Sequence, residues 1–495
     1  MSNQKQLIRV FVLIILFTFG CCISAFSQKI PEDLLARISK FQEEVKQAPT
    51  TPDSYRSRWN TLRMLYGEQT KYFKNLDLEL ELLRDKAKYY NGLIRDWRAG
   101  VSIEANGIKI NPEEQSQKFL DEAIVRLGKE KSPSELEDEK EIFRKRFPSD
   151  KIRYSTTYEG RTYNVYWGEL HGHSYLSDGV NAPYNYYTFS KEIANLDYCA
   201  LTDHSWSSGN KEERWKEIFT TADNLNEPGK FAALPGVEWS SSYGHGHINL
   251  IYYDYPYPET APASRLDYTN NVQTLFDYLE KEGENVVVIR NHTGSSSLGT
   301  DWNYQNPKWN YLIDIVSSIT FRSLNYYSII HERTLETALK AGYRFGFVGT
   351  SDTHTSWPGS GNITAVFSPS LTRKDIGINL KNRFCYAAED RIFVDFRING
   401  KRMGSEIFAK RPDPLEFSIN VEGTDEINSI IVIKNNRSFY SFNLRYIVGE
   451  NIKIKRTYER PKGERPSAVD CYFVIVTQNN GKRAWSSPIW VTTEL

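Results

Sequence analysis

The histidines of this protein gather in one part of the chain. The sequence has 495 residues and eight histidines, all of them between residues 171 and 354. They are His171, His173, His204, His245, His247, His292, His331 and His354. Histidines that serve only packing would be scattered, whereas metal binding and acid–base catalysis require them close together. The distribution therefore predicts one chemical site in the central part of the chain.

The spacing of these residues suggests metal ligands. In His171-Gly172-His173, alternate residues at a strand end point the same way, so both imidazoles can reach one ion. The turn Ser177-Asp178-Gly179 can return a carboxylate to that ion. Further histidines and carboxylates follow short apolar runs: Asp203-His204, Glu238, Asn291-His292 and Asp352-Thr353-His354. We expect Asp203 to orient a ligand imidazole instead of binding metal itself.

The elements that must position these residues alternate between two kinds. Apolar runs predict strands at 198–202, 231–234, 286–289 and 345–348. Amphipathic spacing predicts helices at 272–281 and 332–341. This alternation is typical of a parallel α/β fold, either an open sheet or a barrel. In such folds the active site lies at the carboxyl ends of the strands, which is where these histidines and carboxylates stand.

Different patterns flank this central region. Before about residue 150, apolar residues recur at helical spacing, with helix starts predicted after 49–53 and at Asn111-Pro112. After about residue 391, short strands and hairpin signals such as Asn399-Gly400 predict a small β-sandwich. The expected organisation is a signal peptide at 1–27, a helical segment at 28–150, a metal-binding α/β region at 151–390 and a β-sandwich at 391–495.

The first residues have the pattern of a secretory signal. Basic residues precede an apolar run at 10–19, and Ala25-Phe26-Ser27 offers a cleavage site. The run is short for a membrane crossing. Lipidation at Cys21 is the weaker alternative, because the residues before it fit a lipobox poorly. We therefore expect an exported protein, periplasmic or extracellular, with no transmembrane segment in the mature chain.

Charge and cysteine content narrow the function classes. The chain has 62 basic and 62 acidic residues, a formal net charge of zero, so bulk charge gives no reason to expect nucleic acid as a partner. Outside the signal the cysteines are Cys199, Cys385 and Cys471. Their odd number and wide spacing do not fit a disulfide framework, and their apolar neighbours predict buried thiols.

The motifs resemble those of the PHP (polymerase and histidinol phosphatase) superfamily. The four motifs of that superfamily resemble, in order, 166–174 with Ser177–Gly179, Ala200–His204, Asn291-His292 and Ser351–His354. Further residues resemble those of one branch of the superfamily, which is exported, largely uncharacterised and has a trailing β-domain. These residues are Gly236–Trp239, Gly246–Asn249, Asp301-Trp302 and 484–489. The resemblance runs from about residue 160 to the C-terminus.

This resemblance implies a distorted (β/α)7 barrel with two or three divalent metal ions. Around the first ion it implies His171, His173, Glu238 and Asp352. Glu238 would bridge to a second ion, which is held also by His247 and His292. The third ion would be held by Asp178, His204 and His354. One departure is Asn291, where the branch is expected to carry a second histidine; its effect on substrate contacts or metal occupancy stays open.

The predicted ligand set favours a metal-dependent hydrolase. Mixed imidazole and carboxylate ligands suit zinc, manganese or iron. Paired ions lower the pKa of a bridging water and stabilise both oxygens of an in-line displacement, which phosphoester hydrolysis needs most. The favoured function is an exported phosphoesterase that uses a metal-bridging hydroxide on a small or polymeric substrate, with Glu238, His292 and Asp352 as catalytic residues.

Three residues are candidates for contacts with substrate. Arg290 and Arg322 could each grip two phosphate oxygens, with a surface salt bridge as the alternative for both. Trp302 could line the cleft or pack in the core. The sequence gives no indication of an oligomeric state.

Two other functions remain open. The same hydroxide could cleave an amide or a carboxylic ester. Alternatively, the barrel is only structural and the β-domain binds a surface glycan without catalysis. Turnover of phosphoester or acyl chromogenic substrates distinguishes the two hydrolases, and glycan binding without turnover would indicate the third function.

Overall fold

The computed structural model describes most of the chain. The described residues are 30–73, 78–105, 108–129, 132–144, 153–205, 211–241, 245–259, 262, 271–293, 298–304, 306–309, 311–316, 334–354, 357–359, 361–410, 413–443, 452–460 and 469–494. The expected signal peptide with Cys21, and also Arg322 and His331, lie outside them. Within these ranges no helix combines the length and apolar character needed to cross a membrane. The chain forms two compact units, Met1–Lys131 and Ser132–Leu495.

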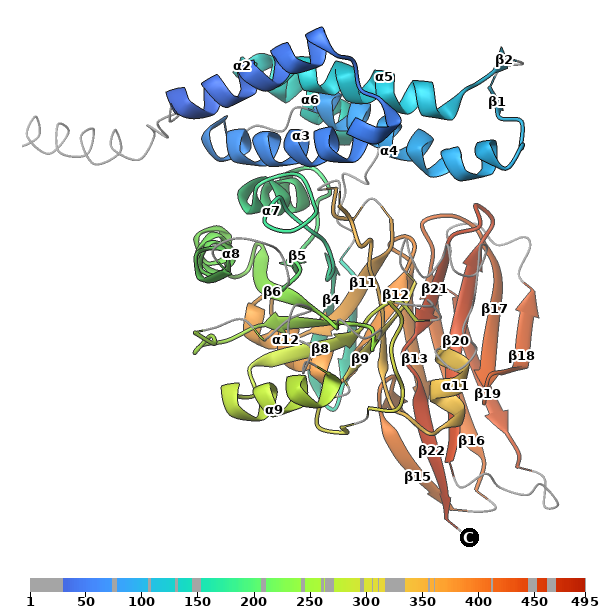
Figure 1. Cartoon of the computed structure of the whole chain (residues 1–495). Helices are drawn as coiled ribbons and strands as arrows, with labels where there is room; N and C mark the ends of the chain where they lie inside the picture. The colour runs from blue at the N-terminus through green and yellow to red at the C-terminus, as the bar shows by residue number, and fades with distance from the viewer. Residues whose placement is uncertain are drawn as a thin grey trace, which may run out of the picture. The chain divides into compact units, whose positions relative to one another are not determined.

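The first unit is helical, as its periodicity predicts. Its elements are α2 (Glu32–Gln47), α3 (Pro52–Phe73), α4 (Leu78–Arg98), β1 (Glu104–Ala105), β2 (Ile108–Lys109) and α5 (Pro112–Val125), coloured blue to cyan in Figure 1. The Asn111 side chain accepts hydrogen bonds from the amides of Glu113 and Glu114 and so caps α5. Thr51 Oγ1 accepts from the amide of Ser54 at the start of α3. Both predicted helix starts are therefore confirmed.

The helical unit ends earlier than the expected residue 150. Helix α6 (Pro133–Arg144) belongs to the second unit. Lys140 Nζ lies 3.1 Å from a carboxylate oxygen of Glu192, and Arg144 Nε donates to the Glu192 carbonyl at 3.3 Å. These contacts tie α6 to the end of the next helix, α7 (Pro183–Glu192).

The second unit begins with an α/β region built on one large sheet. Its strands are β3 (Ser155–Tyr158), β4 (Arg161–Glu169), β5 (Tyr198–Leu201), β6 (Ala232–Ser240), β7 (His247–Tyr252), β8 (Val286–Arg290), β9 (Leu312–Val316), β10 (Gly346–Gly349), β11 (Ile363–Ser368) and β12 (Cys385–Ala388). Besides α7, its helices are α8 (Lys211–Leu225), α9 (Val272–Glu282), α11 (Leu335–Lys340) and α12 (Arg373–Lys381). Helices α7, α8 and α9 lie on the side of these strands away from the later antiparallel strands (Figure 1). The predicted α/β class and the four predicted strands are confirmed.

The sheet is mixed instead of purely parallel. Its order is β10-β9-β8-β7-β6-β5-β4-β11-β12. The strands β4, β5 and β6 run parallel, as do β8, β9 and β10, whereas β7 is antiparallel to both neighbours. The segment 241–246 between β6 and β7 is too short for a parallel crossover, which needs a dozen or more residues. The expectation of a parallel sheet is therefore wrong at β7, and also at β11, which is antiparallel to β4 and to β12.

Strand β10, at one end of this order, approaches β11, which follows β4 on the far side of the sheet. The Thr364 hydroxyl on β11 accepts from the Gly349 amide of β10 at 3.2 Å and donates to the Gly349 carbonyl at 2.8 Å. Past the strand ends, a single parallel bridge joins Gly172 to Thr353, and the His173 amide donates to the Thr353 carbonyl at 2.9 Å. Among the described residues β10 and β11 form no backbone ladder, so a closed barrel is not confirmed.

Strands that pair mostly in antiparallel fashion complete the second unit. They are β13 (Phe393–Ile398), β14 (Lys401–Arg402), β15 (Glu406–Lys410), β16 (Leu415–Glu422), β17 (Ile427–Lys434), β18 (Arg437–Asn443), β19 (Ile452–Tyr458), β20 (Val469–Gln478), β21 (Arg483–Ser486) and β22 (Ile489–Glu494). Strands β14-β13-β16-β19 form a separate sheet. Its Phe417 meets Tyr472 of the large sheet, with ring centroids 5.3 Å apart. Two antiparallel layers thus face one another across an aromatic core.

The large sheet crosses the boundary expected at residue 390. Strand β12 pairs with β21, with Tyr386 opposite Ser486, and the sheet continues through β20, β17 and β18. The α/β region and the trailing strands therefore share one sheet and one compact unit. The expected hairpin at Asn399-Gly400 joins β13 to β14.

Candidate metal centre

The strand ends place the predicted ligands around one point. His171 and His173 follow β4, His204 follows β5, His292 follows β8, and Asp352 and His354 follow β10. Glu238 lies near the end of β6, and His247 begins β7. Side chains with ligand atoms within 4.8 Å of one another form four overlapping groups: His173, Asp178, His204 and His354; His171, His173 and Glu238; His171, His292 and Asp352; His204, Glu238 and His247. The structure thus brings all nine predicted ligands together.

Unusual backbone conformations turn some of these side chains into the cluster. His292 has φ 55° and Asp352 has φ 50°. Such left-handed conformations are uncommon outside glycine and recur at functional sites. Gly172 is required for another reason, since a Cβ there would lie 2.3 Å from the hydroxyl of Tyr186. The H-x-H pair therefore needs its central glycine.

Glu238 lies at the centre of the cluster. Its Oε1 is 2.9 Å from His247 Nδ1, 3.2 Å from His292 Nε2 and 3.3 Å from His171 Nε2. Its Oε2 is 2.9 Å from His204 Nδ1 and 3.4 Å from His173 Nε2. One carboxylate therefore faces imidazoles from four segments of the chain.

Two further carboxylates flank this centre. Asp352 Oδ1 lies 3.3 Å from His171 Nε2 and 3.2 Å from His173 Nε2. Asp178 lies on the more open side, with its side chain 38% exposed and Oδ2 3.3 Å from His354 Nε2. Asp178 Oδ1 is 3.6 Å from both His204 Nε2 and His173 Nδ1. The cluster thus runs from a buried part at Glu238 to an accessible part at Asp178.

Several buried polar atoms of the cluster lack hydrogen bonds. Among the described residues no group is aligned to hydrogen-bond either ring nitrogen of His171, Glu238 Oε2 or Asp352 Oδ2, although Glu238 Oε2 lies 2.9 Å from His204 Nδ1. His171, Glu238 and Asp352 are 0%, 0% and 4% exposed. Burying such groups without a partner is costly, and metal coordination removes that cost. The donor set fits divalent transition metals, for which imidazole and carboxylate are ordinary ligands.

Electrostatics within the cluster are strong. Burial opposes the charged form of His171, but Asp352 and Glu238 outweigh it and raise the pKa of His171 to about 10. In the same way Glu238 and Asp178 outweigh burial and raise the pKa of His204 to about 9. Burial, with His354 and His204 nearby, lowers the pKa of His173 to about 4. The carboxylates thus create a local field that attracts cations.

Asp203 supports the cluster indirectly. Its Oδ1 accepts from the Ser174 amide at 2.8 Å and from Ser177 Oγ at 2.6 Å. Ser177 Oγ in turn lies 3.3 Å from His173 Nδ1. Asp203 belongs to none of the ligand groups among the described residues, and it contacts the ring of His173 through the Ser177 hydroxyl, as expected for a residue that orients a ligand imidazole.

Two residues that support the cluster were not predicted from the sequence. Buried Glu169 accepts from the amides of His171 at 3.0 Å and Ser351 at 3.1 Å, which joins the loop after β4 to the loop after β10. Burial raises the pKa of Glu169 to about 7.

The second of these residues is Asn249, whose Oδ1 accepts from Asn291 Nδ2 at 2.7 Å. Its position two residues after His247 in one strand, and therefore on the same face, is the signal that could have found it.

Asn291 occupies a defined place beside the cluster. Its Nδ2 also lies 3.3 Å from Glu238 Oε1, as a donor. The residue that departs from the expected histidine therefore contacts the central carboxylate. His245 instead pairs with Asp301, Nδ1 to Oδ2 at 2.8 Å, and belongs to none of the ligand groups among the described residues.

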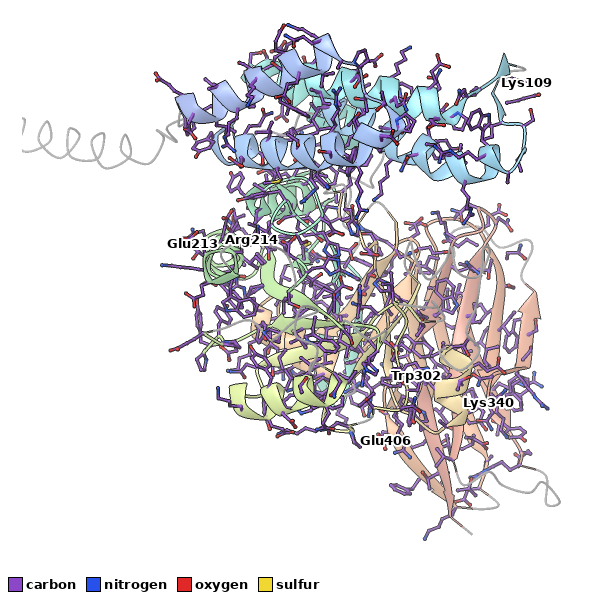
Figure 2. All side chains as sticks on the ribbon, in the orientation of Figure 1. Lys109, Glu213, Arg214, Trp302, Lys340 and Glu406 are labelled. Atoms are coloured by element: carbon purple, nitrogen blue, oxygen red, sulfur yellow. The ribbon has the colours of Figure 1, made fainter. Side chains whose placement is uncertain are left out.

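The described substrate candidates are packed inside the molecule. Arg290 is fully buried, donates to the Tyr304 carbonyl at 2.9 Å and lies over the Phe276 ring. This buried position does not fit the alternative of a surface salt bridge, and it supports a packing role for Arg290. Trp302, labelled in Figure 2, is 7% exposed and contacts the rings of Tyr343 and Phe345. Of the two expected roles of Trp302, core packing is the one that fits this position.

Comparison with known proteins gives similarity over part of the chain. Residues 184–313 match a family described as a protein of unknown function (DUF3604). An uncharacterised protein of Chlamydia pneumoniae is 26% identical over 360 residues, which cover 66% of this chain and 57% of the relative. One from Chlamydia trachomatis is 27% identical over 372 residues, with the same shares. The chain thus spans little more than half the length of these relatives.

Among solved structures there is a distant likeness. A two-domain protein from Bacteroides vulgatus that contains a predicted PHP-like metal-dependent phosphoesterase is 14% identical, with a TM-score of 0.38. The likeness covers 70% of this chain and 99% of that protein.

Proposed function

We propose that the protein is a metal-dependent hydrolase, and within that class a phosphoesterase. The observation that supports this proposal is the position of Glu238, which belongs to two of the ligand groups, one with His171 and His173 and one with His204 and His247. A carboxylate shared in this way is suited to hold two ions close together.

The residues of the cluster have separate roles in this proposal. Glu238 and Asp352 supply negative charge, and the imidazoles of His171, His173, His204, His247 and His292 complete the ligand groups. Paired divalent ions, when bound, lower the pKa of water and stabilise charge on attacking and leaving oxygens. Asp178 and His354 lie toward the accessible side, with side chains 38% and 22% exposed, so substrate would approach there.

Phosphoester cleavage is favoured over amide or ester cleavage for a physical reason. In-line displacement at phosphorus develops charge on both the entering and the departing oxygen, and several adjacent ligand groups are suited to stabilise both. Zinc, manganese and iron fit the donor set best. The same proposal includes export through residues 1–27, a closed barrel and a β-sandwich at 391–495.

A substrate screen tests the reaction class. Protein loaded with zinc, manganese or iron would be offered p-nitrophenyl phosphate, bis-p-nitrophenyl phosphate, p-nitrophenyl acetate and an amide analogue. We expect turnover of a phosphoester that is lost in Glu238→Gln and kept in Asp254→Asn, a surface residue paired with Lys374. Turnover of only the acyl substrates would replace phosphoesterase by ester or amide hydrolase. No turnover by any metal-loaded form would contradict the hydrolase proposal.

A further inference from the structure

A cationic pocket lies at the opposite edge of the sheet from the metal centre. It has a volume of about 500 Å³ and is lined by Tyr158, Tyr311, Lys381, Arg383, Lys401 and Arg402, with Glu406 at its side. Glu406 is labelled in Figure 2. Tyr158 stands just before β4 and Tyr311 just before β9, whereas the metal ligands follow the ends of the strands. Ten residues of extended chain, about 30 Å, separate Arg161 from His171.

Three separate segments build the pocket, two with its cations and one with Tyr158. Lys381 ends α12, and Arg383 stands between α12 and β12. Lys401 and Arg402 form β14, which the turn at Asn399-Gly400 folds back against β13. The β3–β4 hairpin contributes Tyr158, and Lys401 Nζ lies 2.9 Å from a carboxylate oxygen of Glu159 in its turn. Convergence of distant segments on one cavity is typical of a binding site.

The carboxylates nearby do not neutralise this charge. The pocket is lined by four basic side chains and one acidic one, and when Glu159, the partner of Lys401, is counted as well, two positive charges remain in excess. Glu406 pairs with Arg383 at 3.0 Å and also with Arg344, so it is shared between two guanidinium groups. Among the described residues, Lys381 and Arg402 form no ion pair with a carboxylate.

Main-chain oxygens and rings hold these two cations in place. Lys381 Nζ donates to the Glu284 carbonyl at 2.7 Å and lies 5.0 Å from the centroid of Tyr311. Arg402 Nη1 donates to the carbonyls of Asn382 and Met403, and its guanidinium lies 4.1 Å from the centroid of the Phe384 ring. Burial lowers the pKa of Arg402, and the charge of Arg383 adds to this effect. Oriented cations that repel one another are stabilised when an anion binds between them.

We propose that this pocket binds a small ligand that carries two or more oxyanion groups, such as phosphates, sulfates or sulfonates. Fork-shaped guanidinium groups suit planar or tetrahedral oxyanions, and the tyrosine rings provide walls for a flat or sugar-like body. The site is separate from the metal centre and does not depend on the proposed hydrolase activity.

Calorimetric titration with naphthalene-1,3,6-trisulfonate tests this proposal. The probe carries three fixed negative charges and binds divalent metals weakly, so it separates the pocket from the metal centre. We expect saturable binding that weakens as salt is added. In Lys381→Gln/Lys401→Gln, affinity should fall about tenfold or more, because two charge-assisted contacts are lost.

Matched variants make the result decisive. Lys340→Gln/Lys374→Gln removes the same charge from two surface residues that pair with Glu336 and Asp254 outside the pocket, and should bind as the wild type does. Lys381→Arg/Lys401→Arg should keep binding, and melting temperatures would confirm that each variant folds. His171→Ala/His173→Ala should also bind normally. Equal affinity in the Lys381→Gln/Lys401→Gln variant and the wild type, or no saturable binding by the wild type, would overturn the proposal.

Discussion

Glu238 Oε2 lies 2.9 Å from Nδ1 of His204, across a parallel bridge that joins β6 to the segment after β5. The other oxygen of the same carboxylate faces His247 and His292. Because one side chain contacts both sets of imidazoles, its charge should matter for every ion that the cluster holds.

Glu238→Gln tests this directly. The substitution keeps the shape of the side chain but removes its negative charge and replaces one oxygen by an NH2 group, which cannot coordinate a metal ion. Metal content should fall by at least one equivalent, and hydrolysis should fall by more than the roughly 10- to 100-fold typical of supporting residues. Mass spectrometry would measure the metal content, and initial rates would measure the hydrolysis. Full metal content in this variant would refute the shared role of Glu238.

Asp203→Ala should weaken the site from outside it. The alanine side chain cannot accept the hydrogen bonds that the Ser174 amide and the Ser177 hydroxyl donate to Asp203 Oδ1, so Ser177 would no longer fix the ring of His173. Metal affinity should fall roughly 10- to 100-fold, with the fold retained. Competition with a chromogenic chelator measures the affinity. Unchanged affinity would mean that Ser177 does not position His173.

Metal removal should destabilise the second unit. Without ions, buried His171, Glu238 and Asp352 keep polar atoms that have no hydrogen-bond partner among the described residues. At a free metal concentration 100-fold above Kd, the ions would contribute about 3 kcal/mol to the free energy of unfolding. Chelation should therefore lower the melting temperature of the wild type measurably. His171→Ala/His173→Ala serves as the control, and an equal shift in that variant would speak against the prediction.

Thr364→Val tests how β10 and β11 are held. The substitution keeps the shape of the side chain but removes the hydroxyl that bonds both backbone groups of Gly349. Unfolding free energy should fall by about 1–3 kcal/mol, because buried backbone groups lose their partner. Denaturant titration measures the change, and metal content should stay unchanged. A variant as stable as the wild type would show that this hydroxyl contributes little.

The three described cysteines should be protected from thiol reagents. Cys199, Cys385 and Cys471 are buried and free, and burial raises the pKa of Cys385 and of Cys471 to about 12. A buried thiol with a raised pKa is a poor nucleophile. Ellman's reagent should leave protein without residues 1–27 unlabelled until denaturant is added. Rapid labelling of the native protein would contradict the burial.

Local patterns carried much of the fold and of the candidate site. Apolar runs that end in a histidine or carboxylate predicted strands β5, β8 and β10, because burial of a strand on both faces leaves a continuous apolar sequence. Asn111 and Asn399-Gly400 predicted a helix start and a hairpin by their own backbone preferences. The chemistry was predictable where it follows such local signals.

Tertiary relationships were harder to predict. Strand β7 reverses the sheet direction, and its hydrophobic pattern carries no sign of orientation. Glu169 acts by joining loops that are 182 residues apart, so no local spacing marks it. The buried position of Arg290 depends on Tyr304 and Phe276, which sequence spacing does not place around it.

Elemental analysis of the purified protein, beside His171→Ala/His173→Ala, tests the central claim most directly. The metal-centre account predicts two or more equivalents of zinc, manganese or iron in the wild type and a large loss in the variant. A wild type that remains metal-free after incubation with each of these ions would contradict it.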